Sequence, residues 1–86
     1  MLTIGYKSLF LRQYAKLSQA LQREVKEKIE VFQQNPHTPS LYVHKLKGRL
    51  KGCLSFSVNY QYRVVFFYES KNRAVLVDVG DHSIYE

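Results

Sequence analysis

The 86-residue sequence contains a single cysteine, Cys53, and no tryptophan. One cysteine cannot form a disulfide framework within the chain, and it cannot supply a cysteine-based zinc site. No apolar run approaches the roughly 20 residues that a membrane-spanning helix needs. Lys7, Arg12 and Lys16 interrupt the N-terminal segment, which therefore lacks the apolar stretch of a signal peptide. We expect a cytoplasmic protein without a transmembrane helix.

Acidic residues are also few, seven against thirteen lysines and arginines, and the net charge is +6. The second half of the chain shows no paired acids of the kind that two-carboxylate or two-metal sites need. Gly48 and Gly52 do not have the spacing of a phosphate-binding glycine loop. The three histidines show no metal-ligand spacing, so we expect no metal and no cofactor. The positive charge favours a polyanionic partner: nucleic acid, an acidic protein or an anionic membrane surface.

The first half of the chain has helical periodicity, and we expect a single domain over residues 1–86. A short strand is predicted over residues 1–5 and a first helix over residues 8–17. Ser18 can cap a second helix that ends at Asn35, before Pro36. Apolar residues in that helix recur at spacings of four, four and three: Leu21, Val25, Ile29 and Phe32. This stripe predicts one buried helix face, and the two helices form a hairpin.

The second half changes to the period of strands. Residues 50–58 alternate apolar and polar, residues 61–70 are almost continuously β-branched and aromatic, and residues 74–80 form a third apolar run. The predicted fold is α+β, with the order βααβββ and an antiparallel meander packed against two helices. The helices can cover one sheet face only. The other face is predicted to be open and to carry Lys51, Cys53, Ser55, Ser57, Arg63, Val65 and Phe67.

Arg63 interrupts an apolar strand, where a charge is costly unless it is paired. Two interpretations remain open at this level. The arginine pairs with Asp78 on the neighbouring strand or with Glu86, or its planar guanidinium is held ready for a phosphate group.

A basic segment, residues 44–51, leads into the first strand of the meander. Its charged or titratable members are His44, Lys45, Lys47, Arg49 and Lys51. Such a segment is either a solvated loop or a grip for phosphates, and its position beside the strand of Arg63 favours convergence of both on one concavity. In the tail, His82 can transfer a proton near neutral pH, and Tyr85 can stack on a base or pack at the sheet edge.

These motifs together resemble the RelE/ParE superfamily of toxins from type II toxin–antitoxin systems. The resemblance covers nearly the whole chain and rests on the segment HKLKGRLKGCLSFSV, the strand YRVVFFY and the ending VGDHSIYE, in that order. It implies a small basic toxin that a cognate antitoxin neutralises. RelE-like members cut mRNA in the ribosomal A site without metal, whereas ParE-like members poison DNA gyrase.

The resemblance also implies roles for particular residues. Arg63 matches an arginine that stabilises the scissile phosphate, and His82 and His44 match histidines of YafQ-like members. Tyr85 matches an aromatic residue that orients the substrate base. We therefore assign catalytic roles to Arg63, His82, His44 and Tyr85. The residues expected to bind RNA phosphates are Lys45, Lys47, Arg49 and Lys51.

The chain also departs from the family patterns. Ser55 and Ser57 stand where RelE-like members have lysines and YafQ-like members have a histidine, and Gln61 stands where YafQ-like members have an acid. The leading hypothesis is a ribosome-dependent mRNA endoribonuclease that acts through 2′-OH attack. The alternatives are a ParE-like gyrase inhibitor and a catalytically degenerate member that only binds its antitoxin.

Overall fold

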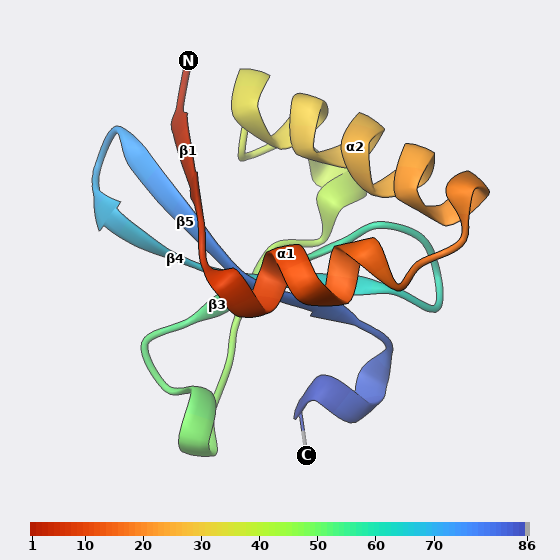
Figure 1. The fold of residues 1–86 in the computed structure, drawn as a ribbon. Coiled ribbons are helices and arrows are strands. Elements are labelled where there is room, and N and C mark those ends of the chain that lie inside the picture. The colour runs from red at the N-terminus through yellow and green to blue at the C-terminus, as the bar shows by residue number, and fades with distance from the viewer. Residues whose placement is uncertain (86) are drawn as a thin grey trace.

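The computed structural model describes residues 1–85, with side chains described as far as Ile84. Two helices, α1 (Ser8–Ala15) and α2 (Gln19–Gln34), pack on one face of a five-stranded sheet (Figure 1). The strands are β1 (Thr3–Tyr6), β2 (His44–Lys45), β3 (Leu54–Ser57), β4 (Arg63–Ser70) and β5 (Arg73–Gly80). Three single turns of 3-10 helix complete the described chain: η1 (Pro39–Leu41), η2 (Gly48–Leu50) and η3 (His82–Tyr85). The predicted α+β class and element order are confirmed.

Helix α2 begins and ends as its sequence predicts. The Ser18 hydroxyl accepts a hydrogen bond from the Leu21 amide at 3.2 Å, which satisfies one amide of the first turn. At the other end Asn35 is extended, with φ −155° and ψ 97°, because Pro36 disfavours helical geometry in the residue before it. Helix α1 stops at Ala15, two residues earlier than predicted. Residues 16–18 are needed for the turn that brings α2 back across the sheet.

The sheet has the order β1-β5-β4-β3-β2, and β1 pairs with β5 in parallel. The predicted three-stranded meander is therefore the centre of a wider, mixed sheet. One edge strand is β1, whose place the sequence pattern left unspecified. The other is β2, which lies inside the basic segment, where no strand was predicted. The strand predicted over residues 50–58 is shorter, since Gly48–Leu50 form η2 and pairing with β4 begins at Leu54.

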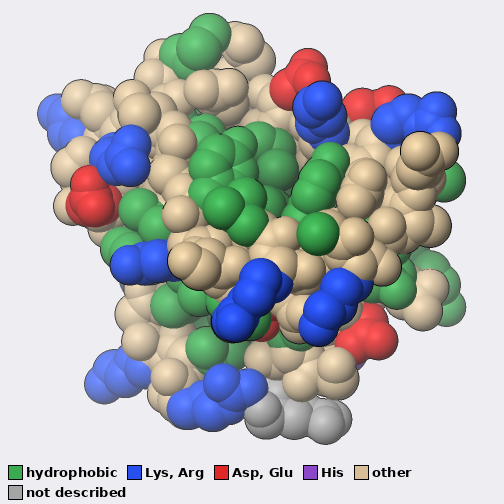
Figure 2. Space-filling model, viewed as in Figure 1, with side chains coloured by type: hydrophobic (Ala, Val, Ile, Leu, Met, Phe, Trp, Pro, Cys, Tyr) green, Lys and Arg blue, Asp and Glu red, His purple; other side chains and the backbone are tan. Residues whose placement is uncertain are grey.

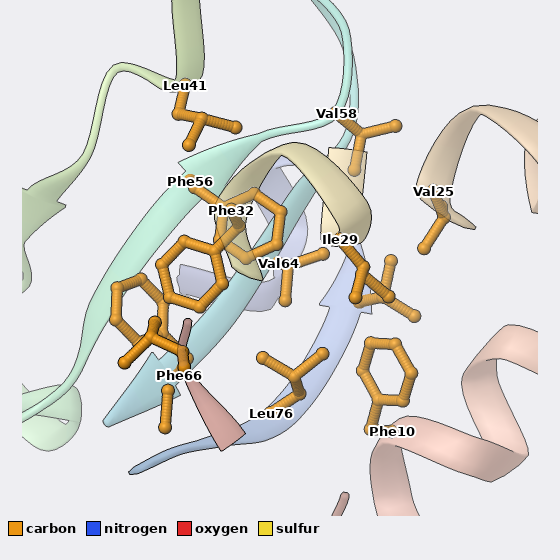
Figure 3. Close-up of a cluster of buried hydrophobic side chains, with 13 residues drawn as sticks. Phe10, Val25, Ile29, Phe32, Leu41, Phe56, Val58, Val64, Phe66 and Leu76 are labelled. Atoms are coloured by element: carbon orange, nitrogen blue, oxygen red, sulfur yellow. The ribbon is translucent and has the colours of Figure 1, made fainter. Parts of the chain in front are cut away.

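The hydrophobic core lies between the helices and the sheet (Figure 3). Val25, Ile29 and Phe32 of the predicted α2 stripe are buried, and Leu21 packs against them. The ring of Phe32 lies 4.6 Å from that of Phe56 on β3 and 4.7 Å from that of Phe66 on β4, measured between centroids. Such pairs contribute about 0.5–1.5 kcal/mol beyond the burial of their area. This cluster joins α2 to the two central strands.

The second face of the sheet is not open, and that prediction is wrong at its centre. Ser55, Val65 and Val75 are 0%, 1% and 5% exposed. The reason is that the chain folds back over this face: η2 follows the edge strand, η3 follows β5, and Arg49 of η2 donates to the carbonyl oxygen of Ile84 at 3.1 Å. Within residues 1–85 there is no helix with the length and apolar character required to cross a membrane.

Candidate functional site

Arg63 begins β4 and is half-buried, with Ser57 and Gly80 as its neighbours on the adjacent strands. Its Nη1 donates to the carbonyl oxygens of Asn59 at 2.8 Å and Tyr62 at 3.2 Å. Asp78 is not its partner, and Glu86 lies outside the described residues. In the part of the chain that the structure describes, the guanidinium has no carboxylate partner. Backbone dipoles therefore satisfy this charge only in part.

The turn before β4 gives Arg63 a rigid support. The Oδ1 atom of Asn59 accepts hydrogen bonds from the amides of Gln61 and Tyr62, both at 2.8 Å. The Nδ2 group of Asn59 donates to a carboxylate oxygen of Glu24 on α2 at 3.3 Å. The Asn59 carbonyl that accepts the hydrogen bond from Arg63 therefore belongs to a turn that is fixed by bonds to its own backbone and to α2. The sequence signal for this support is an asparagine in a short turn, a residue type that bonds to its own backbone.

Arg63 and His44 line one hollow of about 460 Å³. The hollow lies between α2, the η1–β2 connection and the β3–β4 turn. Its lining consists of Lys28, Ser40, Tyr42, His44, Ser57, Val58, Asn59, Tyr60 and Arg63. Two of the predicted catalytic residues are thus brought together from different parts of the chain. Among the described residues, the lining carries the cationic side chains of Lys28 and Arg63 and no carboxylate, so the hollow is suited to an anion.

The ring of His44 is oriented by the backbone. Its Nδ1 atom lies 3.1 Å from the carbonyl oxygen of Tyr42. Because a carbonyl oxygen only accepts, Nδ1 carries the proton of the neutral ring and Nε2 carries the lone pair. Nε2 lies 3.5 Å from the hydroxyl oxygen of the buried Ser55. This tautomer makes Nε2 the atom of His44 that can accept a proton.

The charged and titratable residues of the basic segment do not gather in one place. Lys45, Lys47 and Lys51 line a second hollow, of about 490 Å³, together with Leu46, Leu54 and Cys53. None of the three lysines lines the hollow of Arg63 and His44. The predicted convergence on one concavity is therefore wrong for the lysines and right for His44. In the view of Figure 2, Lys and Arg side chains gather below α1 and around the projecting η2 loop.

Arg49 belongs to neither hollow. Its Nη2 donates to the Ile84 carbonyl, and its charge acts on Asp78 of β5. Burial raises the pKa of the Asp78 carboxyl above its ordinary value of 3.8, while a hydrogen bond from the Val79 amide and the charge of Arg49 act in the opposite direction. The structure thus places Arg49 where it ties η2 to the tail.

The tail forms η3, which begins two residues after Gly80, the strand neighbour of Arg63. Asp81 accepts hydrogen bonds from the amide and the hydroxyl of Ser83, at 3.0 and 2.6 Å, and these bonds lower the pKa of its carboxyl. The turn therefore fixes the backbone at His82, whose side chain is exposed and does not line the hollow of Arg63. Tyr85 ends η3, and its side chain lies outside the described part of the structure.

Lys28, Tyr42 and Tyr60 are among the residues of the hollow that sequence reasoning missed. Lys28 looked like one of the alternating charges on the outer face of α2, and the tyrosines stood in connections with no motif. Tyr42 carried no signal for its unusual backbone, with φ 48° and ψ 48°. Among the described residues, no three His, Cys, Asp or Glu side chains group as metal ligands.

No protein-family model and no curated protein matches the sequence. Solved structures do match over almost the whole chain. YafQ from E. coli is 17% identical, with a TM-score of 0.77 and coverage of 98% of this chain and 97% of that one. The RelBE2 toxin–antitoxin complex of Mycobacterium tuberculosis gives 18% identity, a TM-score of 0.77, and coverage of 94% and 98%.

A third similar structure is the YoeB/ParE toxin from Agrobacterium tumefaciens, 15% identical, with a TM-score of 0.75 and coverage of 94% and 99%. At these identities the likeness establishes the backbone arrangement and its extent, since each match spans both chains nearly end to end. The chain therefore has the fold of the RelE/ParE toxins.

Proposed function

We propose that this protein is the toxin of a type II toxin–antitoxin system and that it cleaves mRNA on the ribosome. The observation that carries the proposal is Arg63: a guanidinium held by two carbonyl oxygens, without a carboxylate partner in the described chain, in one hollow with His44. An RNA phosphate is the anion that supplies the missing charge. The fold shared with YafQ and the RelBE2 toxin supports the same conclusion.

The reaction uses the RNA's own 2′-hydroxyl as nucleophile. The 2′-oxygen bonds to phosphorus, the bond from phosphorus to the 5′-oxygen breaks, and the products are a 2′,3′-cyclic phosphate and a 5′-hydroxyl. His44 Nε2 accepts the 2′-hydroxyl proton. His82 lies outside the hollow, two residues after Gly80, the strand neighbour of Arg63, and in this proposal it protonates the leaving 5′-oxygen of RNA that extends from the hollow toward η3. Arg63 stabilises the charge that develops on the phosphoryl oxygens, a contribution of about 3 kcal/mol for one oriented donor.

The partner in this proposal is an antitoxin with an acidic segment. The net charge of +6 favours such a segment, and similar chains occur in toxin–antitoxin complexes such as YoeB–YefM from Staphylococcus aureus. Figure 2 also shows hydrophobic side chains gathered on the surface between α1 and α2, which a partner helix would cover. The product of an adjacent reading frame should co-purify with the toxin.

Induced expression tests the proposal. Wild-type protein should stop the incorporation of labelled amino acids, and Arg63→Ala should reduce that effect about a hundredfold. Lys71→Ala is the matched control. The substitution also removes one positive charge, but Lys71 lies in the turn at the opposite end of β4. Translation that continues unchanged under wild-type expression, or a fully toxic Arg63→Ala variant, would overturn the assignment. Accumulated gyrase–DNA cleavage complexes with intact mRNA would favour the ParE-like alternative.

A further inference from the structure

Two tyrosine rings at the hollow of Arg63 take little part in the packing of the described fold. Tyr42 is 72% exposed and Tyr60 is 93% exposed, and neither ring packs against another aromatic ring of the described chain. Burial of a tyrosine ring contributes to stability, and these two rings forgo that contribution. Both nevertheless line the same hollow as Arg63 and His44.

The backbone presents each ring from a braced position. Tyr42 has left-handed geometry, which costs an ordinary residue about 1–2 kcal/mol, and is held by its amide bond to the Pro39 carbonyl and by its carbonyl bond to His44. Tyr60 lies in the turn that Asn59 closes, and the Val58 amide donates to the Tyr62 carbonyl across its base at 2.9 Å. Strain retained at an exposed residue indicates a functional position.

The chemistry of the hollow identifies the ligand class. Fixed cations attract phosphates, and exposed aromatic rings offer faces on which unpaired bases stack. A mononucleotide would need one such ring, whereas two rings from separate connections on the rim suit successive nucleotides of a single strand. An acidic protein segment would suit the same rings and cations, but the proton acceptor of His44 in the same hollow favours RNA.

We propose that Tyr42 and Tyr60 form a base-stacking platform that holds single-stranded RNA with its backbone across Arg63. The inference rests on the proposed function in so far as the ligand is the RNA that is cut. It adds a binding subsite formed by the η1–β2 connection and the β3–β4 turn. The platform aligns one phosphate with the guanidinium, and it favours bases that stack strongly.

The test is the affinity of purified protein for a fluorescein-labelled, fully 2′-O-methylated RNA hexamer, which cannot be cleaved because it has no 2′-hydroxyl. Tyr42→Ala and Tyr60→Ala should each weaken binding about 5- to 150-fold. Tyr42→Phe and Tyr60→Phe should bind within about twofold of wild type, since the ring face is kept. Tyr68→Ala is the control, because Tyr68 is exposed at the far end of β4 and lies outside the hollow.

A second probe separates stacking from charge. A hexamer of equal length with abasic sites at its central positions keeps every phosphate, and it should bind wild type as weakly as the intact hexamer binds Tyr60→Ala. Equal affinity of wild type for both hexamers would overturn the proposal. It would also be overturned by alanine variants that bind RNA normally but no longer retain the co-purified product of the adjacent frame, because the rings would then belong to a protein interface.

The hexamer-binding test can fail or succeed separately from the test of the proposed function. Because the probe needs neither a ribosome nor cleavage, tyrosine-dependent binding together with intact mRNA in expressing cells would refute the nuclease and leave the platform standing. Arg63-dependent arrest with unaltered hexamer binding in the tyrosine variants would refute the platform alone. Thermal unfolding of each variant confirms that the alanine proteins are folded.

Discussion

At the scale of single residues, the backbone rather than opposite charge positions the candidate catalytic groups. Arg63 bonds to the carbonyl oxygens of Asn59 and Tyr62, and His44 bonds to that of Tyr42. A carboxylate partner would neutralise Arg63 and compete with a phosphate. Carbonyl oxygens orient the guanidinium group and leave its net positive charge in place. The same principle explains why a charged residue can begin a buried strand.

Asp78 provides a test at this scale, since burial raises its pKa above 3.8. Between the pKa of Asp78 in the unfolded chain and its higher pKa in the folded protein, the folded protein binds more protons. The contribution of Asp78 to the free energy of unfolding therefore falls as pH rises through that window. Asp78→Asn removes the contribution. The free energy of unfolding of the variant minus that of wild type should therefore increase from pH 3 to pH 7, measured by urea denaturation. A difference that decreases over this range would show that Arg49 outweighs the cost of burial.

At the scale of elements, the caps and connections decide where the functional side chains lie. Ser18 starts α2 at the position that brings its Val25, Ile29 and Phe32 stripe over the sheet. In the same helix, Lys28 faces the hollow and Glu24 receives Asn59. The second helix is thus both a wall of the core and a wall of the candidate site.

Ser18→Ala should lower the free energy of unfolding by about 1 kcal/mol, because the first turn of α2 loses its side-chain acceptor. Ser8→Ala is the matched control: Ser8 is the first residue of α1, whose N-cap is Lys7 and has no side-chain cap bond. The control should change stability by less than about 0.5 kcal/mol. Equal losses in the two variants, measured by chemical denaturation, would contradict the assigned cap.

The connection between η2 and η3 should depend on Arg49. Removing its guanidinium in Arg49→Ala deletes the bond to the Ile84 carbonyl, and the backbone amides of the tail should exchange with deuterium several-fold faster. Lys51→Ala removes the same charge from the same segment without touching η3 and should leave tail exchange as in wild type. Unchanged amide exchange in Arg49→Ala would contradict a role for Arg49 in holding the tail and would favour its predicted role in binding phosphates.

At the scale of the whole molecule, the fold was predictable to the extent that local periodicity determines it. The helical stripe, the Ser18 cap, Pro36 and the three central strands all act within a few residues of chain. The parallel pairing of β1 with β5 and the two-residue strand β2 depend on distant backbone partners, and no local pattern encodes them. The buried state of Ser55 likewise follows from η2 and η3 folding over a face that alternation alone leaves open.

The candidate site was predictable for residues that a motif marks. Arg63 stood out as a charge in an apolar strand, and His44 headed a basic segment; the structure brings both into one hollow. Tyr42 and Tyr60 come from connections whose course is set by tertiary structure, so their approach to Arg63 left no signal. The lysines were misplaced because β2 and the η2 turn place them around a second hollow, between β2 and the start of β3.

The most direct test of the central claim is to map the 5′ ends of an mRNA in a purified translation system that contains this protein. For a translated message, new 5′-hydroxyl ends should appear within the reading frame, at ribosome-occupied codons. They should be absent with Arg63→Ala and absent from the same message made untranslatable by a mutated start codon. Intact translated mRNA under wild-type protein, or identical cleavage by Arg63→Ala, would contradict the account.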